Sequence, residues 1–185
     1  MHTDEMWQLY EKNGEAIPGA GWDSALDNPG FDRSEIVGVA VIFVFRVTPE
    51  NGIELLWQKR SQKVSRYPGY YDISAGGHIN LGESLAEAAV REMHEEIGAE
   101  ITTQDLGFVT MRGFNKNRFA WIYAVDWTDR GEDFRFNDEE VEEVKWVPFK
   151  DTYDFVENYA KPSLRGDKLT YEALRIWFEI QGYLK

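Results

Sequence analysis

The sequence predicts an α/β fold in which helices cover both faces of a mixed β-sheet. Residues 37–45 form an almost unbroken run of β-branched and aromatic side chains, which is typical of a strand buried on both faces. The strand and helix patterns after this run do not alternate strictly, so the sheet is expected to be mixed. A chain of 185 residues, 43% of them hydrophobic, suits one domain with a substantial core over residues 1–185.

The first 35 residues are expected to form a hairpin and a loop. An apolar segment starting at Met6 is followed by a turn signal at Asn13-Gly14, which predicts a hairpin over residues 6–17. Residues 18–35 are rich in glycine and proline and are therefore predicted to be a connecting loop.

The remaining elements follow the strand at 37–45. A turn at 49–52 and an apolar segment at 53–58 predict an antiparallel partner for that strand. Further strands are expected at 71–75, 107–112, 119–127 and 143–147, and helices at 84–97, 151–159 and 167–183. The last two helices make up residues 150–185. The final one is amphipathic, so it is expected to pack on the domain, with a homodimer contact as the alternative.

The charge and the absence of cysteine exclude several classes of protein. The chain has 20 basic and 33 acidic residues, a formal net charge of −13, which argues against binding to nucleic-acid backbone or to an anionic membrane. Without cysteine there can be no disulfide, thiolate metal site or cysteine nucleophile. The acidic N-terminus and the short apolar runs predict a cytoplasmic protein with no membrane partner.

The helix at 84–97 carries three acidic side chains on one face. Glu92, Glu95 and Glu96 are spaced i, i+3 and i+4, so they project within an arc of about 100°. Like charges this close repel one another, and a hard divalent cation with oxygen ligands, Mg²⁺ or alternatively Mn²⁺, turns the repulsion into attraction. The competing interpretation is a solvated acidic face with no ligand.

Residues around this helix support the cation-binding interpretation. Arg91 can brace Glu95 or reach back to Glu83, and Ser84 can cap the helix together with Glu87. The Gly76-Gly77 pair allows close approach of the backbone, so the Gly76 carbonyl is a candidate for a further metal ligand.

This stretch resembles the conserved box of the Nudix hydrolase family. The matching positions are Gly77, Glu83, Arg91, Glu92, Met93, Glu95, Glu96, Gly98 and Ala99. The resemblance implies an α/β/α sandwich and a Mg²⁺-dependent hydrolase that cleaves a small-molecule diphosphate, typically a nucleoside diphosphate linked to another group. It also implies roles for single residues. The metal ligands would be Glu92, Glu95, Glu96 and the Gly76 carbonyl, and the catalytic groups Glu95, Glu96 and Arg91.

Members of the family often add a carboxylate from a loop before a late strand. In this chain Glu140 is the first candidate, followed by Glu139 and then Glu143.

A narrower resemblance connects the chain to the branch that contains isopentenyl-diphosphate isomerase. It rests on residues 58–61, 67–69 and 71–78, and it implies that Arg60 and Lys63 face the substrate diphosphate. Isomerase activity is the first alternative function. It is disfavoured because that enzyme uses a catalytic cysteine where this chain has Gly76, and several histidine ligands where this chain has three histidines in all. A non-catalytic nucleotide sensor is the second alternative.

Specificity is less well defined by the sequence. Arg112 and Arg118 are candidates for contact with a terminal phosphate or sugar. The aromatic residues that could stack on a base are Trp22, Phe31, Phe114 and Trp121, and packing in the core is the more common alternative for each of them.

Overall fold

The computed structural model describes residues 5–23, 36–114, 117–136 and 139–184. Phe31, one of the candidate base-stacking residues, lies outside this part of the chain, and so does the side chain of Phe114. The elements in chain order are β1 (Met6–Tyr10), β2 (Ala16–Asp23), β3 (Ile36–Thr48), β4 (Gly52–Arg60), β5 (Tyr71–Asp72), β6 (Ala75–His78), α1 (Leu85–Ile97), β7 (Gly107–Phe114), β8 (Arg118–Asp126), β9 (Val141–Pro148), α2 (Thr152–Tyr159) and α3 (Lys168–Ile180). Short 3₁₀ turns lie at Thr103–Asp105, Phe149–Asp151 and Pro162–Leu164.

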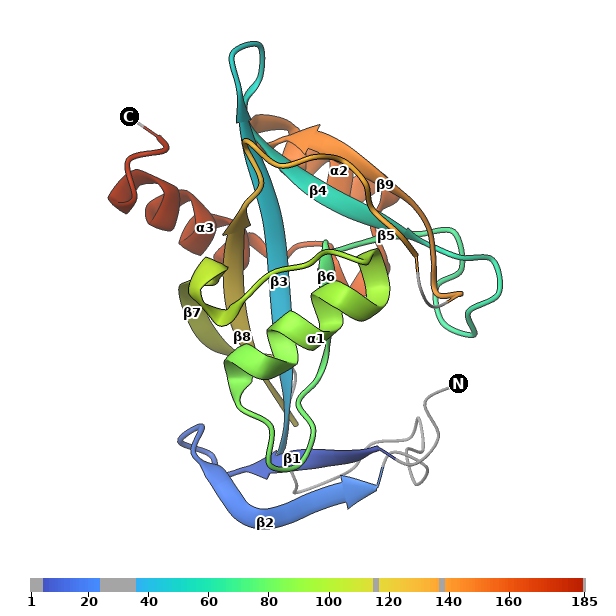
Figure 1. The fold of residues 1–185 in the computed structure, drawn as a ribbon, viewed down its shortest axis with the longest axis vertical. Helices are drawn as coiled ribbons and strands as arrows, with labels where there is room; N and C mark the ends of the chain where they lie inside the picture. Colours follow the sequence, from blue (N-terminus) through green and yellow to red (C-terminus); the bar gives the residue numbers. More distant parts are fainter. Residues whose placement is uncertain (1–4, 24–35, 115–116, 137–138, 185) are drawn as a thin grey trace.

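Strand β3 is the centre of the sheet (Figure 1). One of its edges pairs with β8 in parallel, from Val37 opposite Arg118 to Phe45 opposite Asp126. The antiparallel partners β1, β6 and β4 pair with successive parts of β3. Strand β4 in turn carries β5 and β9. The sheet is therefore mixed, as the sequence predicted.

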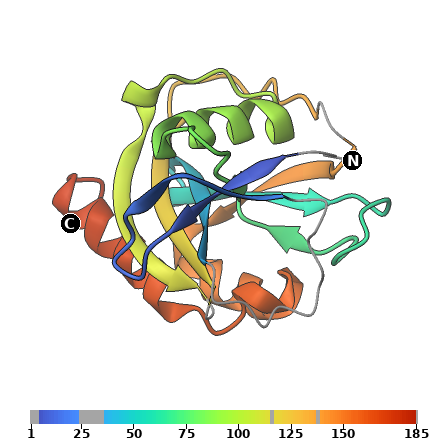
Figure 2. The same cartoon turned by 90° about the horizontal axis from the view of Figure 1, so that it is seen from below.

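Helices lie on the two faces of this sheet, as the view in Figure 2 shows. Helix α1 covers one face, where Ala40, Ile42 and Val44 of β3 join its apolar side chains in a first core cluster. On the other face Phe43 and Phe45 join residues of α2 and α3 in a second cluster. Because successive residues of a strand point to opposite faces, one continuous apolar run supplies both cores.

The N-terminal region differs from the prediction. The hairpin forms, with β1 antiparallel to β2, but β2 continues to Asp23 and so includes residues predicted to be a loop. Pro18 is tolerated because β2 lies at the edge of the sheet, where a missing N–H breaks no ladder.

The predicted strand at 71–75 is divided in two. Strand β5 pairs with β4, whereas β6 pairs with β3. Ser74 lies between the two strands. It receives a hydrogen bond from the backbone N–H of Val44 and donates one to the carbonyl of Leu56, which ties β3 to β4 at the point where they separate.

Helix α1 has the ends that the sequence predicted. Ser84 accepts a hydrogen bond from the N–H of Glu87, and Glu87 accepts one from the N–H of Ser84, which completes a capping box. Gly98 ends the helix in a left-handed conformation with φ of 64°. Across the described residues, no helix combines the length and the apolar character needed to cross a membrane.

Candidate active site

Two glycines allow the acidic face of α1 to approach β6 closely. A Cβ at Gly77 would lie 2.2 Å from Oε1 of Glu92, so any side chain there would displace the carboxylate. The N–H of Gly76 donates a hydrogen bond of 3.0 Å to Oε2 of Glu96. The missing side chains of β6 therefore leave the space that these two carboxylates occupy.

Glu92 and Glu96 are both buried, each with 8% of its surface exposed. Glu96 also receives a 2.8 Å hydrogen bond from Nε2 of Gln58 on β4. Burial raises the pKa of Glu92 to about 7, although the neighbouring Arg91 guanidinium acts in the opposite direction. A buried carboxylate is costly unless a positive charge or donors compensate it, so this wall is suited to a cation.

Arg91 connects the acidic residues of the helix. Its guanidinium donates to Glu83 at 2.9 Å, to Glu92 at 2.8 Å and to Glu95 at 3.0 Å. Arg91 also donates to the carbonyl of His78, at the end of β6. Arg91 thus makes both of the contacts expected from the sequence, and it also fixes the helix against the glycine strand.

The three glutamates do not lie in equivalent positions. Glu95 is half-exposed and is held by Arg91, whereas Glu92 and Glu96 line a cavity. No cluster of three or more acidic or histidine side chains in the described parts of the chain is close enough to hold a metal ion as it stands. Each carboxylate instead has a donor from the protein.

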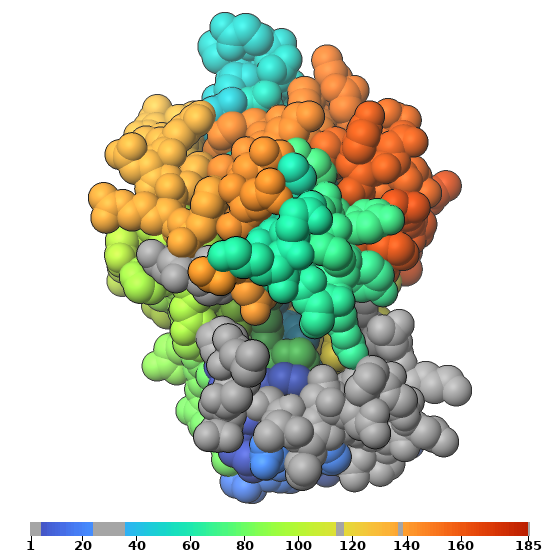
Figure 3. All heavy atoms as spheres, turned by 90° about the vertical axis from the view of Figure 1, so that its right-hand side faces the viewer, coloured from blue at the N-terminus to red at the C-terminus, as the bar shows by residue number. Residues whose placement is uncertain are grey.

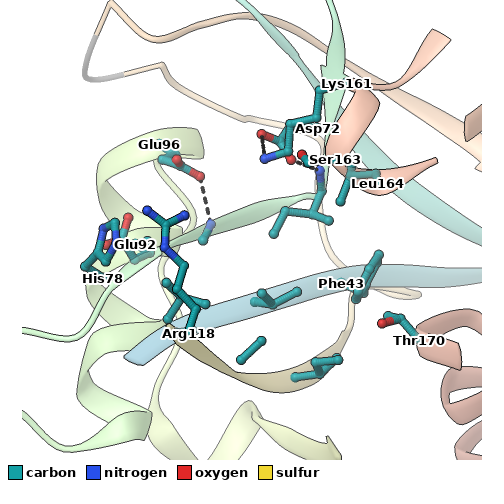
Figure 4. Close-up of a pocket in the computed structure, with 18 of the residues that line it drawn as sticks. Phe43, Asp72, His78, Glu92, Glu96, Arg118, Lys161, Ser163, Leu164 and Thr170 are labelled. Atoms are coloured by element: carbon teal, nitrogen blue, oxygen red, sulfur yellow. Dashed lines mark hydrogen bonds and ion pairs between the residues drawn. The ribbon is translucent and has the colours of Figure 1, made fainter. Parts of the chain in front are cut away.

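The cavity has a volume of about 530 Å³. In Figure 3 the surface is hollowed beside the loop at residues 61–70, coloured teal, and the dark blue N-terminal strand is visible at the lower edge of the hollow. Val39 and Val41 of β3 form part of the floor, with Ala120 and Ile122 of the adjacent β8. Figure 4 shows Glu92, Glu96 and His78 on one side of this cavity, with Asp72, Lys161 and Ser163 across from them.

The wall opposite α1 is built around a buried ion pair. The carboxylate of Asp72, on β5, lies 2.5 Å from Nζ of Lys161 and 3.7 Å from Nη1 of Arg60. The backbone N–H of Lys161 donates to the carbonyl of Tyr71, which fastens the segment between α2 and α3 to β5. Both cations line the cavity, so the structure brings Arg60 to the same cavity as Glu92 and Glu96.

Lys63 lies elsewhere. Its side chain is 67% exposed and forms a 2.9 Å ion pair with the exposed Glu139, and it is not among the described side chains that line the cavity. The exposed loop at 61–70 directs Lys63 toward the acidic loop before β9 instead.

The three candidates for an additional carboxylate also differ in whether they line the cavity. Glu140 lines the cavity, whereas Glu139 pairs with Lys63. Glu143, on β9, accepts a 2.6 Å hydrogen bond from the hydroxyl of Tyr71. Of the three candidates for an additional carboxylate, Glu140 is the one that the structure brings to the cavity.

Two of the candidates for substrate specificity line the cavity, and Trp121 does not. Arg112 and Arg118 both line the cavity, and Arg112 donates to Asp167 and Thr170 at the start of α3. Trp121 does not, because it is buried in the core under α1, 4.8 Å from the ring of Tyr10. The assignment of Trp121 as a base-stacking residue is therefore wrong: its position in β8 directs it to the face opposite the cavity.

Sequence reasoning missed several residues of the cavity. Trp7 comes from β1, Asp72 from β5 and Lys161 from the segment after α2. Asp72 lies in the stretch 71–78 that carries the narrower resemblance, where it stands isolated among apolar and small residues, but the sequence patterns assign it no role. Trp7 and Lys161 belong to no motif quoted above.

The chain resembles known proteins over most of its length. The NUDIX domain family model matches residues 36–165. Nudix hydrolase 3 of Arabidopsis thaliana is 33% identical over 114 residues, which cover 56% of this chain and 15% of that protein. Isopentenyl-diphosphate Delta-isomerase of Escherichia coli is 28% identical over 136 residues, which cover 70% of this chain and 67% of that enzyme.

The fold has a close match among solved structures as well. The protein DR0079 of Deinococcus radiodurans superposes with a TM-score of 0.66 and 22% identity, over 92% of this chain and 98% of that chain. The match to the Arabidopsis protein spans much less than two thirds of that relative's length.

Proposed function

This chain belongs to the NUDIX domain family, and we propose that it is a Mg²⁺-dependent hydrolase that cleaves the diphosphate linkage of a nucleoside diphosphate joined to another group. The observation that carries the proposal is the pairing of opposite charges across one cavity. Buried carboxylates from α1 form one wall, and Arg60 and Lys161 form the other. A diphosphate bound between them would meet the cations on one side and a carboxylate-bound metal ion on the other.

The residues on the α1 wall fit a hard cation. Carboxylate oxygens are the ligands that Mg²⁺ prefers, and the missing side chain of Gly77 lets the Glu92 carboxylate lie against the glycine strand. Glu92, Glu96 and the Gly76 carbonyl would hold the ion, with Glu95 on the same helix. When bound, the ion would neutralise phosphate charge and lower the pKa of an attacking water.

The remaining residues bind, orient and accept a proton. Arg60 binds the diphosphate, and Asp72 holds this guanidinium and the ammonium of Lys161 on the same wall. Arg91 fixes the carboxylates of Glu92 and Glu95. Water oxygen attacks phosphorus, the bond from phosphorus to the bridging oxygen breaks, and we assign Glu140 to accept the proton of the water.

The isomerase alternative is opposed by packing at position 76. A Cβ there would lie 2.6 Å from the backbone oxygen of Ala40 and 2.9 Å from Cδ1 of Ile73. The structure has no room for a cysteine side chain at this position, which the isomerase reaction would need for one of its two proton transfers.

A panel of substrates tests the proposal. Nucleotide sugars, dinucleotides, coenzyme A derivatives and nucleoside triphosphates are incubated with Mg²⁺ and the phosphate-containing products are identified. The expected result is cleavage at a phosphoanhydride in one of these classes and no dimethylallyl isomer from isopentenyl diphosphate. Ligand-dependent increases in melting temperature without any product would instead favour the nucleotide sensor.

A further inference from the structure

The N-terminal hairpin contributes an aromatic residue to the cavity beside the glutamates. Trp7 of β1 lines the cavity and has only 7% of its surface exposed. Its two neighbours are fixed to the segment after β6, because the N–H of Gln8 donates to the carbonyl of Ile79 and the N–H of Leu81 donates to the carbonyl of Met6. The position of the indole is therefore determined by backbone hydrogen bonds on either side of it.

The indole of Trp7 is stacked on the imidazole of His78. The ring centroids are 3.6 Å apart and the planes differ by 7°. His78 is the last residue of β6, and its carbonyl accepts a hydrogen bond from Arg91. This stack places the hairpin next to Glu92, at the end of the glycine strand.

Both stacked rings have a nitrogen atom that lacks a partner. Nε1 of Trp7 and Nε2 of His78 are buried, and neither has a hydrogen-bond partner among the described residues. A buried donor without an acceptor is costly, and buried indole N–H groups usually have one. Stacking alone does not account for the indole, because a phenylalanine would also stack.

Arg118 brings a positive charge to the side of the cavity that carries Trp7, His78 and Glu92. The positive charges of Arg118 and Arg91 both act on His78, and Arg118 lines the same cavity. A neutral N–H donor in such surroundings is best matched by a negatively charged oxygen.

We propose that the Trp7 indole N–H donates a hydrogen bond to a phosphoryl oxygen of the substrate, with the His78 ring orienting the indole and adding Nε2 as a second polar contact. The inference rests on the proposed function, because it takes the ligand to be a diphosphate. It makes the N-terminal hairpin part of the substrate-binding site and places a phosphate group of the substrate on the hairpin side of the cavity.

The test compares two buried tryptophans. Trp7→Phe keeps an aromatic ring for stacking but removes the donor. Trp127→Phe is the matched control, since Trp127 is also buried, donates from its indole to the carbonyl of Gly131, and is not among the described residues that line the cavity. Calorimetry measures binding of methylenediphosphonate, a diphosphate that water does not cleave, in the presence of Mg²⁺. Trp7→Phe is expected to weaken binding about tenfold, the effect of one hydrogen bond to a charged group, and Trp127→Phe to leave it unchanged.

A spectroscopic readout tests the hydrogen bond itself. In protein with ¹⁵N-labelled tryptophan, the indole resonance that is missing from Trp7→Phe should move downfield when the diphosphonate is added. Equal affinity of Trp7→Phe and the unsubstituted protein, an unmoved resonance, or no binding of the probe would each overturn the proposal.

The outcomes separate this inference from the proposed function. Weaker binding in Trp7→Phe without hydrolysis of any substrate in the panel would retain the phosphate subsite and reject the hydrolase. Hydrolysis of a substrate in the panel that is unaffected by Trp7→Phe would retain the hydrolase and reject the phosphate contact of Trp7.

Discussion

The two walls of the cavity are built in opposite ways. The acidic wall comes from one helix and the adjacent strand, within residues 76–96. Arg91 holds Glu92 and Glu95, whereas the N–H of Gly76 and the side chain of Gln58 hold Glu96. The basic wall joins Arg60 of β4, Asp72 of β5 and Lys161 near the C-terminus, residues brought together by the sheet and the segment after α2. The acidic wall is consequently visible in one local sequence pattern. On the basic wall, Arg60 and Asp72 lie in separate stretches of sequence, and their grouping with Lys161 exists only in the folded chain.

This difference suggests that the two walls have different roles. The acidic wall has the composition of the family's box and would supply the chemistry that its members share. The basic wall and the residues near it, including Ser163 and Thr170, would decide which group is attached to the diphosphate. Substitutions on the two walls should therefore affect different kinetic constants.

The largest effect is expected for Glu96→Gln. The turnover number should fall by at least about 10²-fold, the scale of loss when one electrostatic group of an active site is removed. The fold should persist, because the amide oxygen can still accept the N–H of Gly76. Steady-state kinetics with Mg²⁺ and circular dichroism measure the two quantities. Glu100→Gln, at an exposed position after the same helix, is the control, and a fully active Glu96→Gln would disprove the role of this carboxylate.

Gly77→Ala tests whether the glycine strand creates the space for Glu92. The added Cβ would lie 2.2 Å from the carboxylate oxygen, so Glu92 must move. We expect a loss of about 1–3 kcal/mol in the free energy of unfolding from overpacking, together with weaker binding of Mg²⁺. Denaturant titration and calorimetry with Mg²⁺ provide the measurements.

The control for this substitution is Gly131→Ala, where the added Cβ would have its nearest contact at 3.7 Å, an ordinary van der Waals distance. Equal stability and Mg²⁺ affinity in the two alanine variants would contradict the account of the glycine strand.

Lys161→Met probes the basic wall. It leaves the buried Asp72 with Arg60 alone, at 3.7 Å, and should cost about 2 kcal/mol in the free energy of unfolding while raising KM several-fold. Adding Asp72→Asn removes the unpaired charge, so the double variant should recover stability but keep the high KM. If the double variant recovered both its stability and the KM of the parent protein, Lys161 would serve stability only. Lys168→Met, at an exposed position, is the control.

The smallest effect is expected for a carboxylate outside both walls. Hydrogen bonds from Thr102 and Arg130 lower the pKa of Asp105 from 3.8 to about 2. Because the folded pKa is depressed, the ionised group stabilises the protein above about pH 4, and this contribution is lost as the pH falls toward 2. Asp105→Asn should reduce the free energy of unfolding by less than about 1 kcal/mol at pH 7, and by less still as the pH approaches the folded pKa of about 2.

Urea titrations at several pH values test this prediction. At pH 7 the rate of hydrolysis should be the same in Asp105→Asn and in the parent protein. A difference in stability between Asp105→Asn and the parent protein that is as large at pH 2 as at pH 7 would contradict the assignment.

Sequence patterns predicted the structural features that depend on residues close together in the chain. The capping box of Ser84 and Glu87, the helix end at Gly98 and the double burial of β3 all follow from spacing within a few residues. The contact of Lys161 with Asp72 and the stacking of Trp7 on His78 join distant segments, so no local pattern contains them. For Trp121 the sequence left base stacking and core packing open, because an aromatic residue in a strand has the same local pattern whether it faces a cavity or the core, and the structure places it in the core.

The pairing of β3 with β8 has a consequence for how the protein folds. Residue 37 must pair with residue 118 before the floor of the cavity can form. Both edges of β3 must be paired with other strands before the two walls face each other. Proteins dominated by such distant contacts fold slowly compared with helical proteins of similar size. Catalytic competence should therefore return late in refolding, together with the last global phase, even though α1 with its capping box can begin to form early.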